Sequence, residues 1–446
     1  MSSDSSYQKT IDYLYALQKH GVKLALANSA ALMEVMGNPH HRFRSVHVAG
    51  TNGKGSTSAF IAGMLRAAGY RVGLYTSPHL VSFTERIRIN GIPISEARVV
   101  ELARRVREGY ERPASAAVLN PTFFEVTTAM AFTYFAEEGV DIVVVEVGMG
   151  GRLDSTNVIT PLVSVITNID MEHMEYLGDT LEIIAGEKAG IIKPGVPVVT
   201  GATQPGALGV IERRAAEQKT RAFRLSVDFK AGNISSGQEQ VFDYNGINAS
   251  SDRLSIAMLG RHQVDNACLA LAAVECLRKA GITVDEAAMR RGLAETHWEG
   301  RLERVARTPD IYLDGAHNPA SALVLAQAVK TMKRSYTRLI LVIGILGDKD
   351  YRGIITELVP LADHVIVTRP DYARAMEPSV LAAEVRALHS SVATAETVSR
   401  ALAVAKETAK PDDLVLVTGS LYVVGDARAA LVENSGQAQA LSGLKG

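Results

Sequence analysis

Short apolar runs alternate with amphipathic segments along most of the chain. Residues 142–147 form a nearly continuous aliphatic run, which is typical of a strand buried on both faces of a parallel sheet. Because predicted strands and helices alternate, the pattern indicates an open, mostly parallel α/β sheet. We expect strands at residues 45–49, 71–75, 141–147, 162–167 and 196–200, and helices at 6–20, 29–36, 58–68, 94–110, 122–137, 181–189 and 261–280.

The second half of the chain changes character twice. Residues 223–258 are polar and alternate only weakly, which predicts antiparallel strands appended to the first domain. Apolar runs of strand length then return, separated by helical stretches, and predict a second, smaller α/β domain of Rossmann-like type. We therefore divide the chain into domains at 1–295 and 296–446. The strands of the second domain are expected at 310–314, 339–344, 364–368 and 413–418.

Composition narrows the class of protein. Hydrophobic residues make up 47% of the chain and charged residues 21%, as in ordinary soluble domains. A formal net charge of −1 gives no support to nucleic acid as a partner, and two cysteines are too few for a disulfide framework. The polar N-terminus and the shortness of the longest apolar runs indicate a cytoplasmic protein without a membrane partner.

The sequence HVAGTNGKGST at 47–57 lies between a predicted strand and a predicted helix. Glycines at 50, 53 and 55 allow a sharp turn that brings backbone N–H groups close to an anion, and the helix N-terminus favours negative charge. Lys54 supplies a positive charge and Ser56 a hydroxyl. The motif departs from the generic phosphate-loop spacing because Gly55 stands between Lys54 and Ser56. A phosphate-binding loop is favoured over a tight turn with an exposed lysine.

Polar residues follow three neighbouring strands of the predicted sheet. Glu146 ends a buried strand, where a carboxylate must be paired or bound to a cation. Ser77 and His173 stand in the loops after two other strands. Each has an ordinary alternative: an ion pair for Glu146, a helix cap for Ser77 and a plain loop histidine for His173. Beside a phosphate loop, we favour a magnesium site at this edge.

Three other residues have ordinary roles on pattern alone, and a fourth does not. Lys188 would be a surface lysine on a helix, and Arg301 and His317 would be polar loop residues. Asp314 follows the apolar run at 311–313, so it occupies the carboxyl end of a strand, where α/β sheets bind ligands.

The chain resembles the folylpolyglutamate synthase and dihydrofolate synthase family of the Mur ligase superfamily over roughly residues 20–428. The family's phosphate loop also carries the additional glycine. The resemblance implies a two-domain, ATP-dependent ligase. It rests on the motifs HVAGTNGKGST, TSPHL, VEVGMGGRLDSTN, NIDMEHMEYLG, GEKAGIIK, HQVDNA, WEGRLERV, LDGAHNP and TGSLYVVG, in that order.

The same resemblance implies roles for individual residues. Lys54, Lys188 and His317 are the catalytic candidates, and Lys188 matches a lysine that the family carries as a carbamate. The implied ATP contacts are Gly53, Lys54, Gly55, Ser56, Asn266, Arg301 and Asp314, and the implied Mg²⁺ ligands are Ser77, Glu146 and His173.

Two further segments match the family's pteroate-binding regions, and other positions match the surroundings of the incoming glutamate. One departure is Ala-Leu-Ala-Asn at 25–28, where the family usually has Gly-Leu-Glu-Arg, just before a helix that would contact the pterin. The pteroate positions are Thr122, Phe123, Phe124, Glu125, Leu153, Asp154 and Ser155, and the glutamate positions are Ser420, Tyr422 and His317.

The resemblance implies a monomeric ligase that adds L-glutamate to dihydropteroate, to reduced folates, or to both. ATP would activate the acceptor carboxylate as an acyl phosphate. The alternatives are a monofunctional folylpolyglutamate synthase, another Mur-type amino-acid ligase and a nucleotide-binding switch. The TSPHL motif argues against a cell-wall ligase, and a switch would leave Arg301 and Asp314 unexplained.

Overall fold

The computed structural model describes residues 3–21, 25–111, 120–237, 239–332 and 335–431. The chain divides into two compact units, Met1–Ala257 with Gln263–Thr296 and Met258–His262 with His297–Gly446. The predicted domain boundary falls one residue before the break at Thr296. The segment 258–262 was predicted in the first domain but belongs to the second unit, because Leu259 packs against the hydrophobic core of that unit.

The first unit is built on an eight-stranded sheet in the order β4-β3-β2-β5-β1-β6-β7-β8. The strands from β2 to β8 in this order run parallel, and β3 and β4 are antiparallel. The predicted parallel sheet is therefore confirmed. Its strands are β1 (Arg44–Ala49), β2 (Val72–Tyr75), β3 (Ile87–Ile89), β4 (Ile92–Pro93), β5 (Ile142–Glu146), β6 (Val163–Ile166), β7 (Val198–Thr200) and β8 (Ala222–Arg224).

Two parts of this sheet differ from the sequence analysis. Strands β3 and β4 were not predicted, because they are only three and two residues long and too short for a visible period. Phe223 was expected to begin the antiparallel region. It lies instead in β8, a parallel strand at the edge of the main sheet, where it pairs with Val199.

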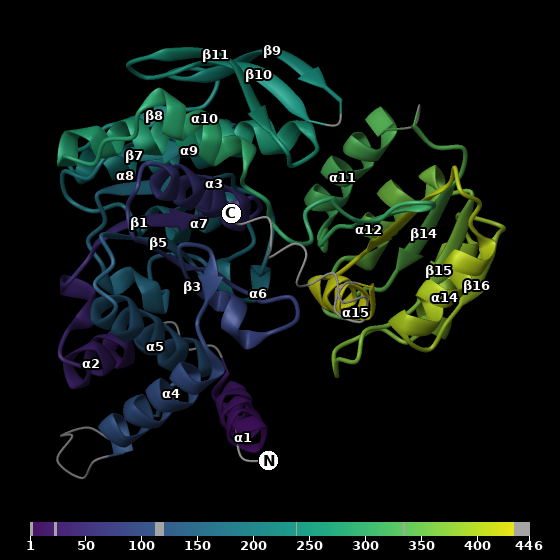
Figure 1. The fold of residues 1–446 in the computed structure, drawn as a ribbon, viewed down its shortest axis with the longest axis horizontal. Coiled ribbons are helices and arrows are strands. Elements are labelled where there is room, and N and C mark those ends of the chain that lie inside the picture. Colours follow the sequence, from purple (N-terminus) through teal and green to yellow (C-terminus); the bar gives the residue numbers. More distant parts are fainter. Residues whose placement is uncertain (1–2, 22–24, 112–119, 238, 333–334, 432–446) are drawn as a thin grey trace. The chain divides into compact units, whose positions relative to one another are not determined.

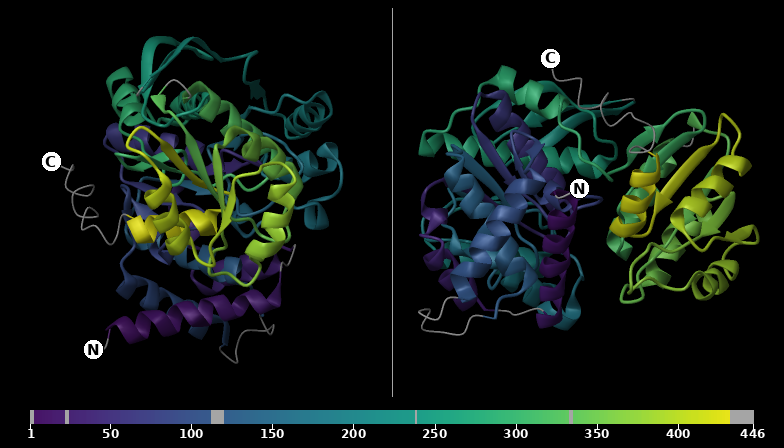
Figure 2. Two further views of the ribbon diagram at one scale, coloured as in Figure 1. Left: turned by 90° about the vertical axis from the view of Figure 1, so that its right-hand side faces the viewer. Right: turned by 60° about the horizontal axis from the view of Figure 1, so that its bottom comes forward.

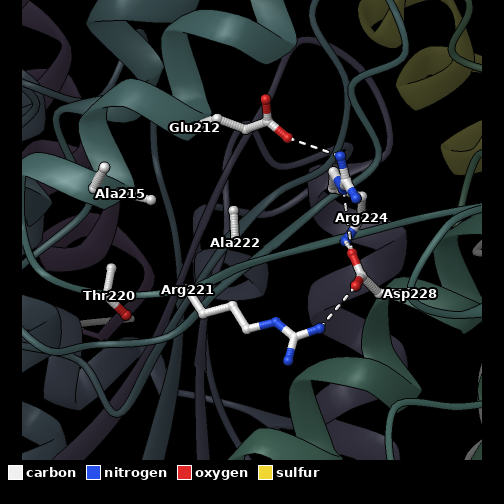
Figure 3. A pocket seen from close by; sticks show the side chains of 8 residues that line it. Glu212, Ala215, Thr220, Arg221, Ala222, Arg224 and Asp228 are labelled. Carbon is white, nitrogen blue, oxygen red and sulfur yellow. Dashed lines mark hydrogen bonds and ion pairs between the residues drawn. The ribbon is translucent and has the colours of Figure 1, made fainter.

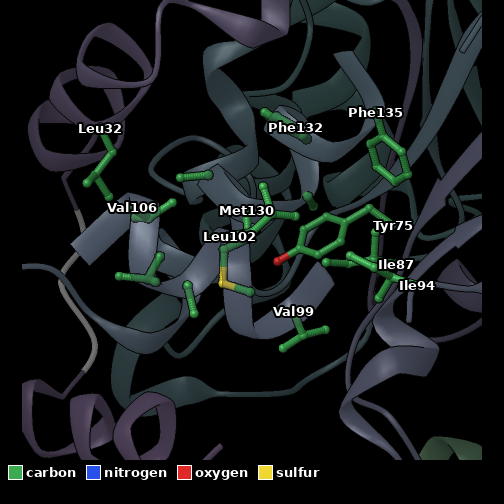
Figure 4. Close-up of a cluster of buried hydrophobic side chains, with 14 of the residues drawn as sticks. Leu32, Tyr75, Ile87, Ile94, Val99, Leu102, Val106, Met130, Phe132 and Phe135 are labelled. Carbon is green, nitrogen blue, oxygen red and sulfur yellow. The ribbon is translucent and has the colours of Figure 1, made fainter. Parts of the chain in front are cut away.

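Helices of the first unit pack on the central strands through a large apolar cluster. Figure 4 shows Leu32 of α2, Leu102 of α4 and Phe132 of α5 in the same cluster as Tyr75 on β2. The Tyr75 hydroxyl is buried with Thr127 and Thr128 of α5, at 3.1 and 3.3 Å. The helices are α1 (Ser3–Ala16), α2 (Ala27–Val35), α3 (Lys54–Ala67), α4 (Glu96–Glu111), α5 (Phe123–Glu137), α6 (Met174–Leu177), α7 (Leu181–Ala189), α8 (Pro205–Glu217), α9 (Arg261–Leu277) and α10 (Glu286–Ala294).

A separate antiparallel sheet of β9 (Lys230–Ser236), β10 (Gln240–Asn245) and β11 (Ser250–Ile256) completes the first unit. Figure 1 shows it beside α9 and α10. The Tyr244 hydroxyl of β10 donates a hydrogen bond to Glu275 of α9 at 2.8 Å. These three strands confirm the predicted antiparallel addition.

The second unit has a six-stranded sheet in the order β12-β13-β17-β14-β15-β16, in which only β12 is antiparallel. The edge strands β12 and β16 were not predicted, because their residues are mostly half-exposed and lack an apolar run. The strands are β12 (Glu303–Ala306), β13 (Asp310–Leu313), β14 (Leu339–Ile343), β15 (His364–Val367), β16 (Val392–Thr394) and β17 (Leu414–Thr418).

Helices cover both faces of this second sheet, as Figure 2 shows. Alternate residues of β14 point to opposite faces, and Leu341 shares a core with helices α11, α12 and α13. Helices α14 and α15 pack together and against the central strands. The predicted Rossmann-like architecture is confirmed. The helices are α11 (Pro319–Met332), α12 (Tyr351–Leu358), α13 (Pro378–Arg386), α14 (Val398–Thr408) and α15 (Leu421–Leu431).

Candidate functional site

The glycine-rich loop turns from β1 into α3 as predicted. Gly53 has φ of +82° and immediately precedes the first residue of the helix, Lys54. A Cβ at Gly53 would lie 2.4 Å from the Asn266 side-chain oxygen, so only glycine fits there without a shift. The Lys54 ammonium donates hydrogen bonds to the carbonyl oxygens of Gly50 and Thr51, both at 3.0 Å. These bonds curl Lys54 back over the loop, whose backbone can approach an anion closely.

Lys188 is not the surface lysine that its helical pattern suggested. Its side chain is 2% exposed, and its ammonium donates to the Gly50 carbonyl at 2.9 Å. Burial, reinforced by the charge of Lys54, lowers the pKa of Lys188 to about 7. A buried lysine with this pKa is neutral for part of the time near pH 7, and a neutral amine can act as a nucleophile.

The loop is held in place by residues to which the sequence analysis gave no role. The Asn168 side chain accepts a hydrogen bond from the backbone of Asn52 at 2.7 Å. The backbone of Asp170 and the hydroxyl of Thr51 exchange two bonds, at 3.0 and 3.1 Å. Asn168 and Asp170 belong to a motif of the family resemblance and follow β6, the neighbour of β1 in the sheet. Their position at the carboxyl end of that strand is the sequence signal that could have indicated this role.

Two of the three predicted magnesium ligands lie together. The buried Glu146 carboxylate, at the end of β5, accepts a hydrogen bond from the backbone N–H of Ser77 at 3.1 Å. His173 immediately precedes α6 in the left-handed conformation, and its imidazole lies 3.7 Å from the carboxylate of Glu172. Among the described residues, no group of three His, Cys, Asp or Glu side chains could hold a metal. A magnesium ion shared with phosphate oxygens needs no such group, since it keeps waters and takes one or two carboxylates, so Glu146 fits that role.

The first predicted pteroate segment, 122–125, forms the start of α5. Thr122 caps this helix and exchanges hydrogen bonds with Glu125 in a capping box, so both residues have a structural role. The ring of Phe124 packs against Gly148, because a Cβ on Gly148 would lie only 2.5 Å from that ring. Glu125 is 2% exposed, and its second carboxylate oxygen, Oε1, has no hydrogen-bond partner among the described residues. Asn28 donates to Glu125 at 3.4 Å, so the departure from the family at 25–28 lies beside this segment.

The glycine-rich loop after β5 is organised by one carboxylate. Asp154 accepts hydrogen bonds from the backbone of Met149 at 2.9 Å and of Thr156 at 3.0 Å. Burial raises the pKa of Asp154. Ser155 is also buried, and Leu153 is half-buried. The segment 153–155 is therefore held rigidly, as a recognition surface needs to be.

In the second unit, Asp314 and Arg301 lie close to each other at the carboxyl end of β13. The Asp314 carboxylate accepts hydrogen bonds from the backbone of Leu302 and Ala316, both at 2.9 Å. Burial raises its pKa and the charge of Arg301 opposes that rise. Arg301 and Gly315 are adjacent, because a Cβ at Gly315 would be 2.6 Å from the guanidinium. His317 donates through Nδ1 to the Gly315 carbonyl at 2.8 Å.

Two of the three predicted glutamate positions of the same unit, Ser420 and Tyr422, lie after β17. Ser420 is buried and accepts a hydrogen bond from the Val423 backbone at 3.1 Å. The ring of Tyr422 stacks on Tyr372 with ring centres 4.0 Å apart. Burial, followed by the hydrogen bond to Tyr372, raises the pKa of Tyr422 to about 12.

A pocket of about 320 Å³ between α8 and β8 contains none of the predicted site residues. Figure 3 shows that Arg224 bonds to both Glu212 and Asp228, and that Arg221 also reaches Asp228. The charges of this pocket satisfy one another, so we assign it no ligand.

Comparison with known proteins places this geometry in a family. The chain matches the Mur ligase middle domain over residues 48–274 and the Mur ligase glutamate ligase domain over residues 300–421. It is 40% identical over 435 residues to the dihydrofolate synthase/folylpolyglutamate synthase of Bacillus subtilis, covering 96% of this chain and 99% of that protein. This chain belongs to the dihydrofolate synthase/folylpolyglutamate synthase family of Mur ligases.

Other members of the family agree in both sequence and fold. The folylpolyglutamate synthase of Lacticaseibacillus casei is 37% identical, with 96% of this chain and 99% of that protein covered. The solved Mycobacterium tuberculosis folylpolyglutamate synthase complexed with ADP superimposes with a TM-score of 0.90 at 35% identity, covering 96% of this chain and 99% of that one. The predicted family, fold class and ATP-dependent ligase activity are thereby confirmed. Within the described residues, no helix is both long and apolar enough to span a bilayer.

Proposed function

We propose that this family member joins L-glutamate to dihydropteroate and to the γ-carboxylate of reduced folates, using one ATP for each bond. The observation that carries the proposal is the loop around Gly50. Lys54 and Lys188 both donate hydrogen bonds to the Gly50 carbonyl, just before the N-terminus of α3. The positive charge of Lys54 and the N–H groups at the start of α3 suit a polyphosphate. The match to the Mur ligase glutamate ligase domain supports glutamate as the amine.

The reaction needs activation because a carboxylate and an amine do not condense in water. A carboxylate oxygen of the acceptor attacks the γ-phosphorus of ATP, and the bond to ADP breaks. The amine of glutamate, having lost its proton, then attacks the acyl carbon, and inorganic phosphate leaves. Lys54 neutralises charge on the transferred phosphoryl group, and the rigid loop keeps the reactants oriented.

The remaining site roles belong to the same proposal. Magnesium would be held by Glu146 with Ser77 and His173, and when bound it neutralises charge on the phosphate oxygens. Asn266 would contact adenine, while Arg301 and Asp314 would bind the phosphates and ribose. The segments 122–125 and 153–155 would bind the pteroate group. We also propose a cytoplasmic monomer that acts on small molecules and not on nucleic acid or a membrane.

The deciding experiment supplies each acceptor separately. Purified protein, ATP, Mg²⁺ and L-glutamate are incubated with dihydropteroate or with tetrahydrofolate, and phosphate release and product mass are followed. The proposal expects a product one glutamyl residue heavier from each acceptor. Ligation of tetrahydrofolate alone would identify a monofunctional folylpolyglutamate synthase. Phosphate release without any ligated product would favour a nucleotide switch, and activity only with a cell-wall precursor would favour another Mur-type ligase.

A further inference from the structure

A histidine stands in the middle of β1, the strand that leads into the phosphate loop. His47 is 0% exposed, and β1 lies between β5 and β6 in the sheet. Burying an imidazole there costs free energy unless its N–H finds an acceptor. Its Nε2 lies 2.8 Å from the hydroxyl of Thr156, which is also 0% exposed. The proposed reaction uses neither side chain.

The Thr156 hydroxyl joins His47 to Asp154, in the loop after β5. This hydroxyl donates a hydrogen bond to Oδ1 of the Asp154 carboxylate, and the Thr156 backbone N–H donates to the same oxygen at 3.0 Å. The other oxygen, Oδ2, accepts the backbone N–H of Met149 at 2.9 Å. Asp154 is therefore an acceptor on both oxygens, and the three buried side chains connect β1 to the loop.

The number of available protons fixes the direction of this chain. A threonine hydroxyl has a single proton, and Thr156 gives it to Asp154, so Nε2 of His47 must donate to Thr156. The other ring nitrogen, Nδ1, then has no proton, and it has no hydrogen-bond partner among the described residues. Burial, followed by the charge of Lys193, lowers the pKa of His47 to about 3. The imidazole is therefore neutral at pH 7 and carries one N–H.

The chain of bonds reaches the second predicted pteroate segment, 153–155. Asp154 is the cap of a short 3-10 helix, η4 (Ser155–Val158), so its orientation sets the path of the backbone on either side of it. The backbone bonds to Asp154 hold this turn internally, whereas the bond from His47 fixes it to the central part of the sheet. A binding segment keeps its geometry when a supporting layer of hydrogen bonds holds it in this way.

We propose that His47 is a positioning residue for the acceptor: through Thr156 it fixes the segment 153–155, which would bind the pteroate group. This inference rests on the proposed function. It assigns the first residue of the motif at 47–57 to the acceptor, whereas Lys54 of the same motif acts on ATP. An aliphatic residue would fill this place in β1 without the cost of burying a polar group, so the histidine is explained by the bond that it makes.

The test compares Thr156→Val with Thr156→Ser in the full-length protein. Valine keeps the shape of threonine but lacks the hydroxyl, so it breaks both side-chain bonds, whereas serine keeps the hydroxyl. For Thr156→Val we expect the KM for the acceptor, dihydropteroate or tetrahydrofolate, to rise about tenfold, the scale of a lost hydrogen bond to a charged group. The KM for ATP should stay within about twofold of wild type. Thr156→Ser should recover the acceptor KM to within about threefold of wild type.

Removal of the histidine provides an independent variant. His47→Leu leaves Thr156 able to donate to Asp154 but no longer fixed to β1, so the acceptor KM should rise here as well. Because both changes interrupt one chain, the double variant His47→Leu/Thr156→Val should match the worse single variant in acceptor KM within about twofold. The matched control is Thr133→Val in α5, which removes another buried hydroxyl, bonded to the Ala129 carbonyl at 2.7 Å; it should leave every KM unchanged.

If the chain serves only folding, Thr156→Val and His47→Leu will lower the melting temperature without changing the acceptor KM, and the inference is overturned. Equal increases in the KM for ATP and for the acceptor overturn it as well, since they would place the effect at the phosphate loop. Should His47→Leu fail to fold, the comparison of Thr156→Val with Thr156→Ser decides on its own. A wild-type protein that ligates glutamate to no acceptor would instead refute the proposed function, so the two failures are distinguishable.

Discussion

Lys54 and Lys188 donate hydrogen bonds to the same oxygen atom, the carbonyl of Gly50, at 3.0 and 2.9 Å. Lys54 begins α3, whereas Lys188 lies near the end of α7. Two ammonium groups on one carbonyl repel each other, and this repulsion adds to burial in lowering the pKa of Lys188. The strain is relieved if one lysine loses its charge or if anions bind beside them.

Replacing Lys54 by alanine should abolish ligation and leave the fold intact. The lysine supplies charge to the transferred phosphoryl group and packs little, so we expect kcat to fall on the order of 100-fold or more. The melting temperature should change by less than about 3 °C. Lys279→Ala, at an exposed position of the first unit, is the matched control. A Lys54→Ala variant with normal turnover would contradict a role at the phosphates.

Lys188 should react with carbon dioxide to form a carbamate. At a pKa of about 7, about half of this amine is neutral at pH 7, against roughly one part in a few thousand for an ordinary lysine. Protein equilibrated with ¹³C-bicarbonate should give a carbamate carbon signal that Lys188→Arg lacks. Because the neutral amine prevails above the pKa, labelling at constant dissolved CO₂ should rise as the pH increases through 7. An unlabelled wild-type protein would contradict this prediction.

Glu146→Gln should weaken magnesium dependence specifically. Glutamine can still accept the Ser77 N–H bond but carries no charge, so the fold should persist while the Mg²⁺ concentration for half-maximal activity rises about tenfold or more. High Mg²⁺ should restore part of the activity. The control is Glu138→Gln, which alters a surface ion pair with Arg71. An unchanged Mg²⁺ titration would show that Glu146 serves only to hold the Ser77 loop.

Two glycine-to-alanine substitutions should have opposite effects on stability. Gly50 has φ of +145°, and a Cβ there would lie 1.8 Å from the Thr167 hydroxyl, so Gly50→Ala should destabilise the protein by about 2 kcal/mol or more. Gly186 lies inside α7 with nothing within 4 Å of an added Cβ. Gly186→Ala should stabilise the protein by about 0.5–1 kcal/mol. Urea unfolding of both variants measures the difference, and equal effects would contradict the geometry of the loop.

Much of the site was visible in the sequence because its residues follow buried strands. The runs that end at Ala49 and Glu146 are aliphatic enough to be recognised as central strands, and polar residues directly after such strands reach one edge of a parallel sheet. The short strands β3 and β4 and the half-exposed strands β12 and β16 gave no such signal, because hydrophobic periodicity needs several buried residues to appear. Phe223 was assigned to the wrong sheet for a related reason. The sequence shows that Phe223 is apolar, but it does not show that this residue pairs with Val199 of β7.

Local sequence by itself determined the central strands of both sheets, most of the helices, the turn at Gly53 and the family. Each depends on neighbours along the chain or on motif order, which the sequence carries directly. Only the tertiary structure decided that Lys188 is buried against Gly50, that Asn168 and Asp170 hold the phosphate loop, and that Tyr372 stacks on Tyr422. These contacts join residues from about 50 to nearly 140 positions apart, and burial, which sets the pKa of Lys188, exists only once distant segments have packed together.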